Sequence, residues 1–382
     1  MLSYVTSGES HGPALFAVVT GLPAGLPIDR AFLDAMLARR QGGYGRSERQ
    51  RIERDRVHLV SGVRRGRGTG NPITVRLRNR AGGRFAPVTR PRPGHADLAG
   101  VLKFGHEADA RDVLERSSAR ETAVRTAVGG LCALMLREFG IACFGHVVRL
   151  GKVPFAPGPP DIAVRDASPF HSVDPKGDRK AKEAVDAAAK AGDTLGGVVE
   201  VVATGVPPGL GSNRQADQRL DGRLAAALLA IPAMKGVEIG AGFAAAARRG
   251  SQVHDVIRTG PEGRIVRPTN RAGGLEGGMS NGEPIVVRVA MKPLSTLRRP
   301  LESVDLREGG RKDAHFERSD VTAVPAAAVV AESSVAIVLA QALLEKFGGD
   351  SLGEVRRNVE GYYAQIGAFW GAGGVTPRAA PR

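Results

Sequence analysis

The sequence predicts a mixed α/β fold of the α+β type, formed by a duplicated β-α-β sandwich unit with internal pseudo-two-fold symmetry. Two pairs of similar segments support this prediction. Val18–Pro27 (VVTGLPAGLP) resembles Val201–Gly211 (VVATGVPPGLG), and Gly70–Leu77 (GNPITVRL) resembles Gly282–Val289 (GEPIVVRV). The first pair shows an apolar strand pattern entering a Thr-Gly-x-Pro turn, and the second a Pro-Ile-x-Val-Arg strand. Because the repeat occurs only twice, it indicates a duplicated unit rather than a solenoid.

A helix is expected between the two strands of each half, at 28–41 and at 217–231. Two such halves normally share one core, so we expect residues 1–382 to form a single domain in which sheets enclose helices. Residues 368–382 are rich in Gly, Ala and Pro, a composition that predicts a disordered tail.

Three further segments have ordinary local signals. Apolar residues recur at helical spacing from Val124 to Met135, and Gly140 lies just beyond the end of this predicted helix. Residues 180–190 predict a short amphipathic helix, and 154–175 predict a loop-rich surface segment.

The longest apolar run, Pro325–Leu344, contains Glu332 and other polar residues and is followed by Gly348. We interpret it as a buried helix with a glycine stop rather than a membrane span. The N-terminal residues lack the charged-then-apolar pattern of a signal peptide. Cys132 and Cys143 lie in apolar surroundings without metal-site spacing, which is typical of core residues in a reducing compartment. We therefore expect a soluble, cytoplasmic protein without a metal site.

The net charge of +15 allows three interpretations. Most of the 54 basic residues are arginines spread along the chain, as a coding bias toward Arg and Ala would produce. Such arginines would also suit a site for a small polyanion, because guanidinium binds phosphate and carboxylate bidentately. Nucleic-acid binding is the third choice, since aromatic residues are only 4% and no zinc, basic-zipper or base-stacking motif is present.

Five polar blocks carry candidate chemistry. In RSSARET (116–122), two arginines and three hydroxyls precede an apolar-periodic run, where a helix N-terminus also favours anions. The others are GESHG (8–12), RRQGGYGRSER (39–49), RPRPGHADL (90–98), and MKPLSTL (291–297) taken with ERSD (317–320) and the upstream LEGGMSNGEP.

Each block also has a structural interpretation. A lone histidine such as His11 is more often structural than catalytic, although glycines on both sides let a ligand approach the backbone. A run of charges is usually a solvated face, but glycine-spaced arginines leaving a helix suit a loop that closes over an anion. The prolines of the third block hold the chain extended, so that Arg92 and His95 can face the same side. The string 62–70 is not G-x-G-x-x-G and precedes a strand, so we reject a dinucleotide site there.

In this order and spacing, the motifs resemble those of chorismate synthase. The resemblance rests on GESHG, RRQGGYGR, RPGHADL, ERSSARET, KGVEIG, EGGMSNGEPI, MKP and ERSD, and it runs from about Gly8 to Phe347. It implies a carbon–oxygen lyase that converts 5-enolpyruvylshikimate 3-phosphate (EPSP) to chorismate by 1,4-anti elimination of phosphate, the last common step toward the aromatic amino acids. It also implies a requirement for reduced FMN (FMNH2) without net redox change, and a homotetramer. NADPH enters only as a source of reducing equivalents in some members.

The resemblance also implies roles for individual residues. By similarity, His95 protonates the departing phosphate, His11 donates a proton to the reduced flavin near its N1/O2 edge, and Asp320 accepts a proton from flavin N5. The implied substrate-binding residues are Arg40, Arg46, Arg49, Arg92, Arg120 and Arg318. The implied flavin-binding residues are Ser118, Ala119, Arg120, Gly277, Lys292, Pro293, Leu294, Ser295, Thr296 and Arg318.

One departure from the family pattern affects the flavin site. Many members have Asn where this chain has Pro232, and proline can neither donate from its backbone nor offer an amide. His106 has no counterpart in the motifs and is left out of the site. Two alternatives stay open from the sequence: a basic nucleic-acid-associated protein, and a relative that binds flavin without catalysis. The latter is disfavoured because His11, His95, Arg120 and Asp320 are all present.

Overall fold

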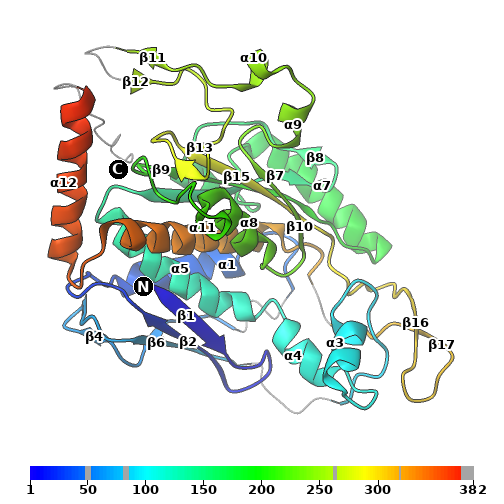
Figure 1. The fold of residues 1–382 in the computed structure, drawn as a ribbon. Helices are drawn as coiled ribbons and strands as arrows, with labels where there is room; N and C mark the ends of the chain where they lie inside the picture. Colours follow the sequence, from blue (N-terminus) through cyan, green and yellow to red (C-terminus); the bar gives the residue numbers. More distant parts are fainter. Residues whose placement is uncertain (48–52, 81–85, 261–264, 318–319, 371–382) are drawn as a thin grey trace.

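Two antiparallel sheets enclose a layer of helices in the computed structural model (Figure 1). The structure describes residues 1–47, 53–80, 86–260, 265–317 and 320–370. The first sheet has the order β1 (Ser3–Ser7), β2 (Ala14–Thr20), β6 (Ile73–Arg78), β3 (His58–Leu59). The second has the order β10 (Met234–Ile239), β15 (Ile285–Met291), β9 (Gly197–Thr204), β7 (Ala142–Leu150), β8 (Val153–Pro154).

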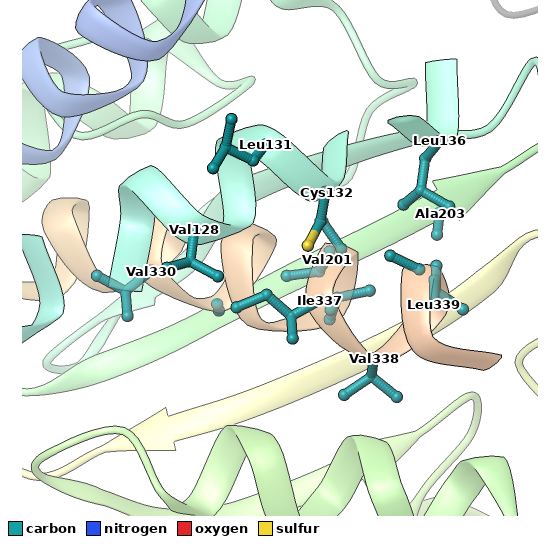
Figure 2. Close-up of a cluster of buried hydrophobic side chains, with 14 of the residues drawn as sticks. Val128, Leu131, Cys132, Leu136, Val201, Ala203, Val330, Ile337, Val338 and Leu339 are labelled. Atoms are coloured by element: carbon teal, nitrogen blue, oxygen red, sulfur yellow. The ribbon is translucent and has the colours of Figure 1, made fainter. Parts of the chain in front are cut away.

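The helix layer provides most of the core. It consists of α1 (Arg30–Gln41), α5 (Glu121–Arg137), α8 (Leu220–Leu229) and α11 (Val324–Phe347). Helix α5 packs on β1, β2 and β6, whereas α11 packs on β7, β9 and β15, and the two helices pack against each other. Figure 2 shows their buried aliphatic side chains meeting those of β9. Burial of this apolar surface is the main favourable contribution to folding.

The predicted duplication is visible in the order of the elements. The series β1, β2, α1, β6, α5 in the first half corresponds to β7, β9, α8, β15, α11 in the second. In both halves the middle strand pairs antiparallel with its two neighbours: β2 with β1 and β6, and β9 with β7 and β15. The fold class predicted from the two repeated segments is therefore confirmed.

A smaller unit lies at one end of the sandwich (Figure 1). It contains α3 (Asp97–Phe104) and α4 (Arg111–Ser117), which share a small apolar cluster of Val88, Val101, Ala110 and Leu114. The hairpin of β16 (Glu302–Val304) and β17 (Arg311–Asp313) is tied to it by hydrogen bonds from Leu306 N to Thr89 O and from His315 N to Arg90 O. The RPGHADL block leads into α3 and belongs to this unit.

The remaining elements are short or peripheral. They are β4 (Val63–Arg64), β5 (Arg67–Gly68), α6 (Ile162–Ala167), α7 (Pro175–Ala191), the 3-10 turn Ala216–Gln218, α9 (Phe243–Ala246), α10 (Gly250–Val253), β11 (Arg258–Thr259), β12 (Ile265–Val266), β13 (Leu275–Glu276), β14 (Met279–Ser280) and α12 (Leu352–Trp370).

Several boundaries differ from the sequence prediction. The segment 154–175, predicted as loop, contains α6, which begins after the N-cap Asp161. Helix α7 begins five residues before 180 because Asp174 caps it and a proline occupies its first turn. Helix α12 extends to Trp370, so 368–370 are helical rather than part of a tail, and 371–382 lie outside the described residues.

Helix α11 is the one helix in the described part of the chain that is long and apolar enough to cross a membrane. Its most apolar stretch is 89% buried within the protein, between α5 and the second sheet. The predicted buried helix with a glycine stop at Gly348 is therefore what the structure contains.

Candidate functional site

A cavity of about 480 Å³ collects residues from both halves of the chain. Its wall comes from the β1–β2 turn, the segment before α3, the junction of α4 and α5, the turn before β10 and the segment after β15. The lining residues are Ser10, His11, Arg92, Gly94, His95, Ala96, Leu114, Ser117, Ser118, Ala119, Pro232, Ala233, Met291, Lys292, Leu294, Ser295, Thr296, Glu317 and Ala323. The volume is in the range of small-molecule sites.

His95 is held by a network within its own block. Its Nδ1 lies 2.5 Å from Oδ1 of Asp97, a carboxylate that is fully buried. Arg92 donates to the same carboxylate from Nε, Nη2 and its backbone N–H, and its Nη1 donates to Oγ1 of Thr296. Burial alone would raise the pKa of Asp97, but the hydrogen bonds from His95 and Arg92 outweigh it and hold this pKa well below its ordinary value.

His11 is held in a similar way by α4. Its Nδ1 lies 2.7 Å from Oε1 of Glu115, and Oε2 of Glu115 accepts a hydrogen bond from its backbone N–H. Arg111, one turn earlier on α4, lies 3.6 Å from the same carboxylate. Burial opposes ionisation of Glu115, but the hydrogen bonds from His11 prevail and lower its pKa. Both cavity histidines therefore face a carboxylate that is ionised at neutral pH.

The rest of the cavity wall combines a cation with hydroxyls and apolar groups. Burial, together with the nearby charge of Lys235, lowers the pKa of Lys292 below its ordinary value. Ser118, Ser295 and Thr296 add hydroxyls, whereas Leu114, Met291, Leu294 and Ala323 are apolar. Such a wall can contact a flat ring system and also bind an anionic group.

Arg40 and Arg120 lie behind this wall rather than in it. Arg120 forms a bidentate ion pair with Asp55, at 2.6 and 2.7 Å, and donates to Oδ1 of Asn79. Arg40 donates to Thr122 Oγ1 and to the carbonyl of Ala119. Burial lowers the pKa of Arg40 to about 9, while the charge of Asp55 opposes this shift. Both arginines brace the junction of α4 and α5, which carries Ser118 and Ala119.

Arg46 and Asp320 form a second pair beyond the described lining of the cavity. Nη1 of Arg46 lies 2.7 Å from Oδ2 of Asp320, and the backbone N–H of Ser47 donates to Oδ1 at 2.6 Å. Arg49 and Arg318, both predicted to bind ligand, lie outside the described residues.

Most, but not all, of the predicted flavin-binding residues are brought together. Ser118, Ala119, Lys292, Leu294, Ser295 and Thr296 line the cavity, whereas Gly277, in the β13–β14 turn, and Pro293 are not among the described lining residues.

Pro232, which was left out of the predicted site, also lines the cavity. The turn it occupies closes with a hydrogen bond from Met234 N to Ile231 O, and Ala233 has a φ of 71°. A Pro followed by a residue with positive φ is typical of a type II turn, where glycine is usual.

Asp97 and Glu115 were missed by the sequence analysis, as was Glu317. Asp97 is part of the quoted RPGHADL block, two residues after His95, and Glu115 directly precedes RSSARET. Their positions in or next to these blocks were the signal in the sequence that could have marked them as site residues. Glu317 accepts a hydrogen bond from Arg111 at 2.8 Å. Burial raises the pKa of Glu317, but hydrogen bonds from His315 and Arg111 outweigh it and lower this pKa to about 2.

Across the described ranges, no group of three or more His, Cys, Asp or Glu residues is arranged to hold a metal ion.

Comparison with known proteins identifies the family. The family model described as "Chorismate synthase" matches residues 2–344. The chain is 53% identical to "Chorismate synthase" of Trichlorobacter lovleyi, over 96% of this chain and 100% of that protein. It is 54% identical to "Chorismate synthase" of Desulforudis audaxviator, over 96% and 99%. A solved structure titled "Crystal Structure of Chorismate Synthase" aligns with a TM-score of 0.79 at 40% identity, over 96% of this chain and 99% of that one. The chain therefore belongs to the chorismate synthase family of phosphate-eliminating lyases.

Proposed function

We propose that this protein converts EPSP to chorismate and inorganic phosphate by 1,4-anti elimination, with reduced FMN as cofactor. The carbon–oxygen bond to phosphate breaks, a ring hydrogen leaves from the carbon at the other end of the 1,4 system, and a second ring double bond forms. The observation that carries the proposal is the meeting of His11 and His95 in one cavity with Lys292 and five hydroxyl side chains. This arrangement offers proton donors next to groups that bind an anion.

The residues present fit a flavin. Leu114, Met291 and Leu294 offer apolar surface for a ring system, and Lys292, Ser295 and Thr296 offer charge and hydrogen bonds for a polar edge or phosphate. When bound, reduced FMN supplies electron density that assists phosphate departure and is recovered as the ring hydrogen leaves. We further propose that Ser118 and Ala119 contact it through the junction of α4 and α5, and that Gly277, Pro293, Arg120 and Arg318 complete the binding set.

The chain's own residues hold the protons. We assign His95 to protonate the phosphate as it departs and His11 to supply a proton to the N1/O2 edge of the flavin. Asp320 is assigned as the proton acceptor near flavin N5, and it pairs with Arg46 at 2.7 Å. A positioned acid of this kind typically contributes about 10²–10⁴-fold to rate.

The substrate anions are assigned to the arginines. EPSP has one phosphate and two carboxylates, which forked guanidinium groups suit. Arg92 lines the cavity directly. Arg40 and Arg120 hold the α4–α5 junction through Thr122 and Asp55. Direct contact of either arginine with the substrate would require a change in these interactions when the ligand binds. Arg46, Arg49 and Arg318 are proposed to contribute further positive charge.

The broader properties follow the family. We propose a cytoplasmic homotetramer that takes a small-molecule substrate and needs no nucleic acid. NADPH is proposed only as a source of reducing equivalents for the flavin. Residues 1–382 are proposed to act as a single domain, which is supported by the apolar core shared between both sheets.

An anaerobic assay tests the function. Purified protein, EPSP and dithionite-reduced FMN are mixed, and chorismate is followed by ultraviolet absorbance with released phosphate measured in parallel. Formation of both products in a one-to-one ratio, with reduced but not oxidised FMN, is the expected result. Binding of EPSP and FMN without either product would contradict the proposal and leave a relative that binds flavin without catalysis. Salt-dependent binding to arbitrary polynucleotides would instead favour the nucleic-acid alternative.

A further inference from the structure

Each cavity histidine uses the same ring nitrogen, Nδ1, to contact a carboxylate. The Nδ1–oxygen distances are 2.5 Å for His95 with Asp97 and 2.7 Å for His11 with Glu115. The two carboxylate side chains are 0% and 10% exposed, and each also faces an arginine. Two separate elements, the start of α3 and the end of α4, thus build the same His–carboxylate–Arg arrangement on one cavity.

We infer that Asp97 and Glu115 are positioning residues for the two histidines, an inference that rests on the proposed function. An ionised carboxylate accepts only, so it requires the proton of the ring to be on Nδ1. In both rings Nε2 is then the nitrogen that can exchange a proton with a ligand, and in His95 it also lies 3.4 Å from Nη2 of Arg92. Donation from Nε2 needs the doubly protonated ring, whose positive charge the carboxylate stabilises.

Nδ1 of His95 lies near both Arg92 and Asp97, and only Asp97 can accept its proton. Nη2 of Arg92 approaches Nδ1 of His95 at 3.1 Å, but Arg92 cannot accept a proton, and Asp97 lies closer to this nitrogen. Arg92 instead donates to Oδ1 and Oδ2 of Asp97 and so fixes the carboxylate plane. Arg111 has the corresponding place beside Glu115 but also binds Glu317 at 2.8 Å, so its hold on Glu115 is looser, at 3.6 Å.

Other charged groups act on the same rings. The cavity wall adds Lys292 from the segment after β15 and Glu317 from the segment after β17. These charges add to the electrostatic field at both rings but do not require the proton to be on Nδ1. Asp97 and Glu115 are the carboxylates that contact Nδ1 of His95 and of His11, respectively. The tautomer therefore depends on these two carboxylates.

The first test is Asp97→Asn in the full-length protein. An amide keeps the shape but removes the negative charge and can present a donor to Nδ1. We expect kcat to fall by about 10²-fold, within the contribution of a positioned acid, and KM for EPSP to change by less than about 3-fold. The high-pH limb of the kcat profile should move to lower pH, because the protonated ring loses its stabilising charge. Glu115→Gln should lower kcat in the same direction.

The second readout does not depend on turnover. Histidine side-chain ¹⁵N NMR of the free protein should show Nδ1–H as the fixed tautomer of His95 and of His11. Asp97→Asn should abolish that state for His95 alone, and Glu115→Gln for His11 alone. Asp178→Asn is the matched control, because Asp178 is a half-buried carboxylate that accepts from Ser168 and Ser172 away from the cavity. It should leave the kcat profile and both histidine signals unchanged.

The outcomes separate this inference from the proposed function. Absence of product from the wild-type protein would contradict the proposed function, while the NMR arm would still test the positioning. Unchanged tautomers and pH profiles in both carboxylate variants would overturn the inference even if the wild type makes chorismate. If Asp97→Asn fails to fold, Glu115→Gln decides alone, since its carboxylate has fewer buried donors.

Discussion

Arg120 and Asp55 form a buried bidentate ion pair, with Nη1–Oδ2 and Nη2–Oδ1 distances of 2.6 and 2.7 Å. The pair ties the first residues of α5 to the chain that leads into the first sheet. Because a guanidinium has five N–H donors, Arg120 keeps further N–H groups while it holds Asp55 and Asn79. In the structure Arg120 braces this junction, and its contact with a ligand stays a prediction.

Asp55→Ala should destabilise the protein strongly. Removing one partner leaves a buried guanidinium without its main counter-charge, which typically costs about 3–5 kcal/mol of unfolding free energy. Glu302→Ala is the control, because its pair with Arg311 is exposed on a hairpin and should contribute less than about 1 kcal/mol. Urea unfolding at neutral pH measures both. Equal losses would show that the Arg120 pair is effectively solvated.

The contact between α5 and α11 should not tolerate a methyl group at Gly129. A Cβ there would lie 2.4 Å from Cβ of Ser333 and 2.6 Å from its Cα, so the backbones of both helices would have to separate. We expect Gly129→Ala to cost about 1–3 kcal/mol through overpacking, despite the better helix propensity of alanine. Gly361→Ala in α12 is the matched control, since nothing lies within 4 Å of the added Cβ. It should stabilise by about 0.5–1 kcal/mol in thermal or urea unfolding. A neutral Gly129→Ala would mean that the helix contact is looser than described.

His171 should make stability depend on pH below neutrality. Burial lowers its pKa to about 4, against the hydrogen bond from Nδ1 to the carbonyl of Pro325, so the folded protein keeps the ring neutral. Between the unfolded value of 6.5 and about 4, the unfolded chain binds more protons, so the free energy of unfolding falls as the pH falls through this window. The loss should approach about 3 kcal/mol at most.

His171→Asn isolates that contribution. Asparagine tolerates the φ of 55° at this position and offers an amide donor to Pro325. The free energy of unfolding, measured in urea at several pH values between 4 and 6.5, should depend less steeply on pH in the variant than in the wild type. Identical slopes would contradict the assignment to His171 and point to the carboxylates instead.

Replacing either cavity histidine should impair turnover without loss of the fold. His95→Asn and His11→Asn are each expected to lower kcat by about 10²–10⁴-fold, because each removes one positioned proton donor. His106→Asn is the control: His106 lines a neighbouring groove beside α3 and not the 480 Å³ cavity. The anaerobic chorismate assay compares the three. Full activity in His95→Asn would remove this residue from the chemistry.

The architecture was largely predictable because short sequence motifs mark the repeated strands and turns. The Thr-Gly-x-Pro turns and Pro-Ile-x-Val-Arg strands are short-range signals, and they placed β2, β6, β9 and β15 correctly. Helix starts were less accurate, as at α7, because Asp174 caps the helix through a local hydrogen bond that periodicity does not register. The extension of α12 to Trp370 was hidden by the glycine content of that stretch.

The site was predictable as a set of blocks but not as an arrangement. Motif order indicated that His11, His95 and Lys292 belong together, and the cavity contains all three. The buried contacts of Arg120 with Asp55 and of Arg40 with Thr122 could not be predicted, because each joins residues that are far apart in the sequence. The roles of Asp97 and Glu115 likewise depend on side-chain direction. Roles for Arg49 and Arg318, outside the described residues, stay predictions.

The central place of α11 has a consequence for biosynthesis. This helix packs against α5 of the first half and against three strands of the second, yet it is among the last segments to be translated. While the ribosome is still making residues 1–323, the apolar faces of α5 and of β7, β9 and β15 have no partner in that position. A nascent chain of this kind exposes aggregation-prone surface until residues 324–347 emerge, so its yield in the cell should depend on chaperones that shield it during synthesis.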